Sequence, residues 1–118
     1  YERKLQIALS QQYTDFDILD YMNVEENSVV KDVLVFIKNE TGEIDVGFIM
    51  THDNGNTYDV EIVESNITYN SYTLDSFTGE HGIELLISNQ KYTDKNDSYS
   101  TTVIKNFNKV YFVYAKCI

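Results

Sequence analysis

The sequence contains few of the residues from which disulfides, metal centres and nucleotide-binding loops are built. Its 118 residues include one Cys, two His, five Gly and no Pro. A single cysteine, Cys117, excludes an internal disulfide. The two histidines, His52 and His81, stand in no zinc-binding spacing, and the glycines form no phosphate-binding fingerprint. We therefore predict no catalytic residue, no metal site and no cofactor.

Long hydrophobic runs are also absent, although hydrophobic residues make up 42% of the chain. No run approaches the roughly 20 apolar residues that cross a bilayer, so we expect no membrane insertion. The length and a charged fraction of 24% are typical of one globular domain, which we place over residues 1–118.

Basic residues are scarce relative to acidic ones. Nine Lys and Arg stand against 19 Asp and Glu, which gives a net charge of −10. This balance argues against direct nucleic-acid binding, because displacing counterions from phosphate needs a cationic face. The charge would steer the protein toward partners with a basic surface.

The start of the chain and its composition bear on compartment and source. The chain begins Tyr1-Glu2-Arg3-Lys4 without an initiator Met, which favours an extracytoplasmic or secreted protein whose leader has been removed. A trimmed cytoplasmic protein is the alternative. Scarce Gly, Ala, Arg and Pro beside abundant Asn, Ile, Lys and Tyr indicate an AT-rich genome.

The N-terminal segment has the periodicity of an amphipathic helix over residues 3–21. Leu5, Leu9, Tyr13 and Phe16 fall at steps of three and four and would form one apolar face. A break near Thr14, followed by a second short helix, is an alternative. Either arrangement predicts a helix that packs on an apolar surface.

From residue 29 onward the period changes to two. The segment 33–38 is apolar on both faces and predicts a central strand, and a hairpin loop over 39–43 connects it to a strand over 44–52. A turn follows at Asp53-Asn54-Gly55-Asn56. We favour the register that sets Met50 opposite Val60, because a two-residue turn would set Met50 opposite Asp59 and mix apolar with acidic side chains.

Further strands are predicted at 67–74, 83–88 and 110–117, the last in the middle of the sheet, and 100–107 is either an edge strand or a short helix. Residues 75–82 and 92–101 are predicted loops. The fold class is α+β: an N-terminal amphipathic helix, about 3–21, packed on a curved antiparallel sheet of five to seven strands, about 29–117.

Acidic side chains gather around the 53–56 turn. Asp53, Asp59 and Glu61 lie beside His52, and their oxygens could help hold a hard cation such as calcium. The spacing does not match an EF-hand loop, because Gly55 comes too early and no Glu follows at the bidentate position. We interpret the segment as an ordinary hairpin tip.

Ten tyrosines suggest a recognition surface, since tyrosine offers contact area and a hydroxyl at low entropic cost. Four of them lie in polar or loop-like surroundings: Tyr69, Tyr72, Tyr92 and Tyr99. Together with Asp53, Asp59 and Glu61 they are the predicted binding residues, and loops 75–82 and 92–101 would form the edges.

These observations favour a non-enzymatic interaction domain that recognises a protein partner through an acidic, tyrosine-bearing surface. Two alternatives stay open. One is a cytoplasmic antagonist or immunity-type protein that blocks a basic site. The other is a small enzyme or ligand-binding domain with its site in the concave face of the sheet.

Overall fold

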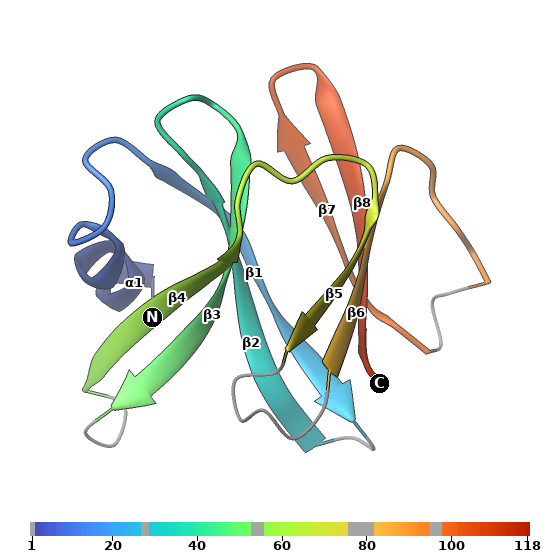
Figure 1. The fold of residues 1–118 in the computed structure, drawn as a ribbon, viewed down its shortest axis with the longest axis horizontal. Coiled ribbons are helices and arrows are strands. Elements are labelled where there is room, and N and C mark those ends of the chain that lie inside the picture. The colour runs from blue at the N-terminus through green and yellow to red at the C-terminus, as the bar shows by residue number, and fades with distance from the viewer. Residues whose placement is uncertain (1, 27–28, 53–55, 76–81, 95–97) are drawn as a thin grey trace. The chain divides into compact units, whose positions relative to one another are not determined.

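A computed structural model of the chain describes residues 2–26, 29–52, 56–75, 82–94 and 98–118 (Figure 1). These residues contain one helix and eight strands, and the strands form two antiparallel sheets with the orders β1-β2-β3-β4 and β5-β6-β8-β7, called sheet A and sheet B below. In chain order the elements are α1 (Glu2–Leu9), β1 (Asp17–Glu26), β2 (Val29–Lys38), β3 (Ile44–His52), β4 (Thr57–Glu64), β5 (Ser71–Asp75), β6 (Gly82–Ser88), β7 (Ser100–Asn106) and β8 (Lys109–Cys117).

The predicted helix packed on antiparallel sheet is confirmed, but one sheet of five to seven strands is wrong. The reason is that the apolar pattern of a strand reports its burial and does not report which strands lie beside it. A strand that is apolar on both faces must be central in some sheet. The pattern does not say in which one, and the structure divides the central strands into the pairs β2–β3 and β6–β8.

The chain forms two compact units. Unit 1 comprises residues 1–21 and 33–67, and unit 2 comprises residues 22–32 and 68–118. Strands β1 and β2 run through both units, so the division does not follow successive segments of the sequence. The prediction of one domain over residues 1–118 stays a prediction.

Unit 1 is built around helix α1, which lies against β4 (Figure 1). Leu5 and Leu9, one helical turn apart, are fully buried. Each buried leucine contributes on the order of 2 kcal/mol. The cluster that they join comprises Leu5, Ala8, Leu9, Val35, Ile37, Ile49 and Val60.

The predicted extent of the helix, 3–21, is wrong beyond Leu9. The Tyr13 amide donates to the Leu9 carbonyl at 2.9 Å, and the chain then turns into strand β1. Met22 and Val24 are buried between exposed neighbours, which is the period of a strand. Tyr13 and Phe16 still pack against the core, but from a turn, so their helical spacing was coincidental.

The hairpin of β2 and β3 agrees with the prediction. The Asn39 amide donates to the Glu43 carbonyl at 2.8 Å, which closes the 39–43 loop. Gly42 takes a φ of 85°, a left-handed conformation that glycine adopts without strain. Strand β2 is buried on both faces, as expected of a central strand: Leu34, Val35, Phe36 and Ile37 are all inaccessible.

The predicted register of β3 with β4 is wrong. Met50 lies opposite Asp59, and Val60 lies opposite Ile49. The prediction assumed that β3 buries only one face, whereas all six residues from Ile44 to Ile49 are buried. Apolar side chains on both faces leave patterning unable to choose between registers. The turn residues 53–55 lie outside the described residues.

A bulge interrupts the same pair of strands. Val46 lies opposite Glu64, but its neighbour Gly47 lies opposite Ile62, so β4 contains one extra residue there. A Cβ at Gly47 would lie 2.8 Å from Val60 Cγ1 and 2.9 Å from the Glu61 carbonyl oxygen. Glycine is therefore required by the close approach of the two backbones.

Sheet B, in unit 2, agrees more closely with the sequence. Strands β6 and β8 occupy the predicted positions, and β8 is central as expected. The undecided segment 100–107 is the edge strand β7, whereas the strand predicted at 67–74 begins only at Ser71. The predicted loop 92–101 is wrong at its end, because β7 already begins at Ser100. Residues 76–81 and 95–97 of the two predicted loops, His81 among them, lie outside the described residues.

Candidate functional site

The four tyrosines predicted for binding do not form one surface. Tyr92 and Tyr99 both contact the ring of Tyr114, at centroid distances of 5.8 and 6.3 Å. Tyr69 instead packs on Tyr111 at 5.0 Å. The Tyr72 hydroxyl accepts the Thr68 amide hydrogen at 2.9 Å. Much of their area is therefore used inside unit 2, and their binding role stays a prediction.

The predicted acidic residues of β4 are exposed. Asp59 Oδ2 lies 2.9 Å from His52 Nε2, and both side chains are at least half exposed. Glu61, two residues along the strand, is also exposed, and Asp53 lies outside the described residues. Within the described part of the chain, no three His, Cys, Asp or Glu side chains come together where they could hold a metal ion.

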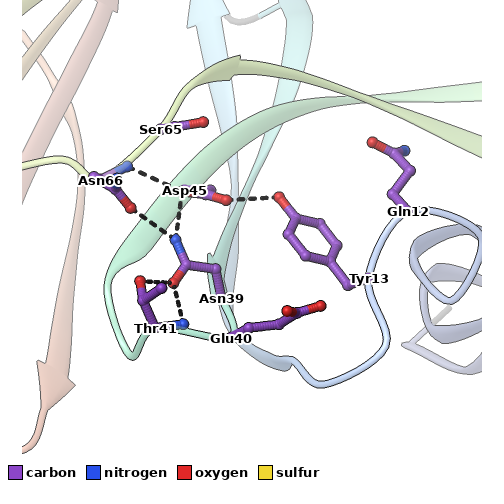
Figure 2. A pocket seen from close by; sticks show the side chains of 8 residues that line it. All are labelled: Gln12, Tyr13, Asn39, Glu40, Thr41, Asp45, Ser65 and Asn66. Atoms are coloured by element: carbon purple, nitrogen blue, oxygen red, sulfur yellow. Dashed lines mark hydrogen bonds between the residues drawn. The ribbon is translucent and has the colours of Figure 1, made fainter.

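The structure brings a different set of polar residues together in an open pocket of about 380 Å³, called the Tyr13 pocket below (Figure 2). All of them belong to unit 1. They come from the turn after α1, the β2–β3 loop, the start of β3 and the segment after β4. The lining residues are Gln12, Tyr13, Asn39, Glu40, Thr41, Asp45, Ser65 and Asn66.

Asp45 is the centre of the Tyr13 pocket. It is 4% exposed, and both carboxylate oxygens accept hydrogen bonds. The Tyr13 hydroxyl donates to Oδ2 at 2.7 Å, while Asn39 Nδ2 and the Asn66 amide each donate to Oδ1 at 2.9 Å (Figure 2). A buried carboxylate is tolerated only when its oxygens are satisfied in this way.

Asn39 and Asn66 are themselves held in place. Asn39 Nδ2 also donates to Asn66 Oδ1 at 2.9 Å, and Asn39 Oδ1 accepts the Thr41 hydroxyl at 2.7 Å. Asn66 has a φ of 54°, which directs its amide at Asp45. Asparagine tolerates this left-handed conformation better than most residues. The floor of the pocket is therefore preorganised.

The rim of the pocket is also fixed. Glu40 Oε1 accepts the Thr14 hydroxyl at 2.7 Å, which ties the β2–β3 loop to the turn after α1. Gln12 Nε2 donates to the Val60 carbonyl at 2.6 Å. The result is a carboxylate at the mouth of the pocket and an amide on its opposite side (Figure 2).

Tyr13 remains a neutral hydrogen-bond donor. Burial raises the pKa of its hydroxyl well above the usual range, and the hydrogen bond to Asp45 and the negative charge of Asp45 raise it further. A hydroxyl in this state is a poor base and a poor nucleophile at neutral pH. Tyr13 therefore offers an aromatic ring and a fixed hydroxyl rather than reactivity.

A second pocket of about 330 Å³ lies between α1 and β4, also within unit 1. Ile7 and Ala8 supply its helical wall, and Lys4 Nζ lies 5.4 Å from the centroid of the Tyr58 ring at its edge. Because the Lys4 ammonium already interacts with the Tyr58 ring, part of the lining of this pocket is engaged within unit 1.

Sequence reasoning missed the Tyr13 pocket. The 39–43 loop was interpreted only as a hairpin, and Tyr13 only as part of a helix. One signal was present: Asp45 stands between Ile44 and Val46 in an otherwise apolar strand. A charged residue in such a position is seldom buried unless it has dedicated partners.

Comparison with known proteins adds no relative: the chain matches no family model, no curated protein and no solved structure. In the part of the chain that the structure describes, no helix has the length and apolarity that crossing a membrane requires.

Proposed function

We propose that the chain is a non-enzymatic interaction domain that recognises a protein partner, and that the Tyr13 pocket receives a basic side chain of that partner. One observation carries the proposal. Two carboxylates, Glu40 and Asp45, line the pocket beside an aromatic ring, and no Lys, Arg or His is among the lining residues. This arrangement is complementary to a cation that arrives from outside.

The chemistry of the pocket favours arginine over lysine. A guanidinium presents several N–H donors in a plane and stacks on aromatic rings, whereas an ammonium is a compact and strongly hydrated charge. Glu40 would accept hydrogen bonds from the guanidinium at the mouth, and the ring of Tyr13 would form a wall. Asp45, whose oxygens are already satisfied, would contribute its negative charge from below.

The charge of unit 1 supports the same partner. Unit 1 contains eleven Asp and Glu residues and three Lys and Arg, a net charge of −8 out of the total of −10. A potential of one sign attracts an oppositely charged surface and speeds its association. A partner with a basic surface would therefore be steered to the unit that holds the pocket.

A broader mode of binding is the second candidate. Asp59 and Glu61 are exposed on β4, away from the Tyr13 pocket lining. An acidic antagonist that blocks a basic site would use such a row through general electrostatic attraction. The two modes differ in which carboxylates matter and in how strongly salt weakens binding.

The test is a titration of the ¹⁵N-labelled protein with acetyl-Gly-Arg-Gly-amide, followed by NMR at 150 mM salt. The control peptide contains citrulline, which keeps the shape of arginine and removes its charge. We expect amide shifts at residues 12–14, 39–41 and 65–66, with a dissociation constant on the order of 1 mM for such a small ligand. Citrulline should give none.

Glu40→Gln should weaken the arginine peptide about tenfold, because it removes the charged acceptor of a charge-assisted hydrogen bond. The matched control is the double variant Asp59→Asn/Glu61→Gln, which removes two charges from unit 1 but leaves the pocket intact. If the control weakens binding and Glu40→Gln does not, the pocket proposal is wrong and the row on β4 is the binding surface.

A further inference from the structure

The four edge strands of the two sheets differ in how their free edges are protected. Edge strands need protection because their unpaired backbone groups can pair with another chain. Strand β1 carries four acidic residues, Asp17, Asp20, Glu25 and Glu26. Helix α1 packs against strand β4, and the Gln12 side chain donates a hydrogen bond to the Val60 carbonyl. Strand β5 has only five residues.

Strand β7 shows none of these features. It has seven residues, contains no Pro and carries a single charge, on Lys105. It pairs with β8 along its whole length, from Ser100 opposite Ala115 to Asn106 opposite Lys109. In the strand order of sheet B it is the last strand.

The hairpin geometry shows which backbone groups of β7 face away from β8. Asn106 and Lys109 close a two-residue turn, and the closing pair of such a hairpin is hydrogen-bonded. Bonding to β8 therefore falls on alternate residues counted back from Asn106. The N–H and C=O groups of Thr101, Val103 and Lys105 point to the open edge.

Two exposed apolar side chains mark the same edge. Val103, at the centre of β7, is 52% exposed, and Phe107, in the turn, is 77% exposed. Phe107 also has a φ of 57°, an unfavourable conformation for a bulky side chain. The hairpin turn itself sets a positive φ at its first residue, so the feature that marks this edge is the exposed apolar area of Val103 and Phe107.

We propose that two copies of this chain associate through β7, pairing antiparallel about a two-fold axis at Val103. In this register Val103 faces Val103 of the second copy, and Thr101 faces Lys105 of the second copy. Roughly six backbone hydrogen bonds would join the two sheets. The same register brings Phe107 toward Tyr99 of the second copy, which would cover both rings.

Strand β7 is complementary to itself, which favours a second copy of this chain as the partner that pairs with its open edge. The pairing overlaps all seven residues and places the single charge of each strand opposite a threonine, so no like charges face one another. Unit 2 also carries a net charge of only −2, with eight acidic and six basic residues. Repulsion between two copies of this acidic chain is therefore weakest through unit 2.

The expected dimer is weak. One strand pair buries less area than the roughly 1,200–2,000 Å² of a stable interface. We expect a dissociation constant on the order of 100 µM, so association should appear only at high protein concentration.

Sedimentation equilibrium from 10 µM to 1 mM tests the proposal. We expect the weight-average mass to rise from the monomer value of 13.7 kDa toward twice that value. Val103→Pro removes an N–H that faces the open edge and leaves bonding to β8 intact, so the variant should fold and stay monomeric. Val103→Lys should weaken the dimer at least about tenfold by opposing two charges on the axis.

The matched control is Thr73→Lys, which adds the same charge to an exposed position of β5 and leaves β7 unchanged. It should dimerise like the original protein, and circular dichroism checks the folding of each variant. A protein that stays monomeric at 1 mM overturns the proposal. So does a dimer that persists in both folded Val103 variants, because association would then use another surface, and so does association of β7 with a foreign strand alone.

Discussion

Unit 1 buries a carboxylate among hydrogen-bond donors, whereas unit 2 buries tyrosines against one another. In unit 1, Asp45 accepts three hydrogen bonds, two of them from the distant residues Tyr13 and Asn66. In unit 2, the Tyr114 hydroxyl accepts the Tyr92 amide at 2.7 Å, and the ring of Tyr99 packs edge-on against Tyr114. Asp32 of unit 2 is buried as well, so the two units differ in the hydrogen-bond network around Asp45 and not in the presence of a buried carboxylate.

The difference separates two kinds of surface. The polar centre of unit 1 opens into the Tyr13 pocket and sits in a unit of net charge −8. Unit 2 is nearly balanced in charge and has an edge strand, β7, with a single charge and an exposed Val103 side chain. We infer that recognition of a basic partner belongs to unit 1 and self-association to unit 2, and four predictions sharpen or break this division.

The largest expected effect compares one glycine of each unit. Gly47→Ala would place a Cβ within 3 Å of the Val60 side chain and of the Glu61 backbone, so we expect a loss of about 3 kcal/mol in the free energy of unfolding. Gly82→Ala would meet mainly the side-chain carbons of Ile118, the nearest at 3.1 Å, which can move. Its cost should stay below about 1 kcal/mol. Urea denaturation measures both, and equal costs would show that sheet A relaxes at the bulge.

The second comparison removes the central polar group of each unit. Asp45→Ala leaves Tyr13, Asn39 and the Asn66 amide without their acceptor, and we expect a cost of about 2 kcal/mol in the free energy of unfolding. Tyr114→Phe removes the hydrogen bond from the Tyr92 amide and the longer one, 3.4 Å, to the Tyr92 carbonyl, but it keeps the ring contacts, so about 1 kcal/mol is expected. If Tyr114→Phe lowers the free energy of unfolding more than Asp45→Ala does, the hydrogen bonds to Asp45 are not a main source of stability in unit 1.

Sequence patterning recovered the parts of the fold that depend on neighbouring residues. The strands β3, β6 and β8 and the 39–43 loop follow from alternation and turn chemistry. The partition into two sheets does not, because burial on both faces says nothing about which strands pair. The Tyr13 pocket could not be predicted from neighbouring residues either, because Asp45 contacts Tyr13 and Asn66 across 32 and 21 residues of sequence.

The third prediction concerns pH. Because the pKa of Tyr13 is raised in the folded state, the unfolded chain loses this proton first as pH rises. The contribution of Tyr13 to stability is therefore complete below pH 10, the ordinary tyrosine value, and declines above it. Tyr13→Phe should cost about 1 kcal/mol at pH 7 through the lost hydrogen bond to Asp45.

The measurement for Tyr13 is the urea midpoint between pH 8 and pH 11. The other nine tyrosines are the same in both proteins, so the difference between the original protein and Tyr13→Phe isolates this hydroxyl. The original protein should lose stability more steeply above pH 10. If the urea midpoints of the two proteins change in parallel with pH, the Tyr13 hydroxyl does not donate a hydrogen bond to Asp45 in solution.

The smallest expected effect compares two residues other than glycine that have a positive φ in the described part of the chain. Asn66 in unit 1 tolerates its φ of 54° and accepts a hydrogen bond from Asn39, whereas Phe107 in unit 2 exposes its ring at a φ of 57°. Asn66→Gly should therefore lose about 0.5 kcal/mol, while Phe107→Gly should gain about 0.5 kcal/mol by relieving strain. Thermal denaturation at 10 µM, where the chain is expected to be monomeric, measures both. If Phe107→Gly instead lowers stability, the Phe107 ring contributes to packing within the monomer. It would then no longer indicate a contact at the β7 edge.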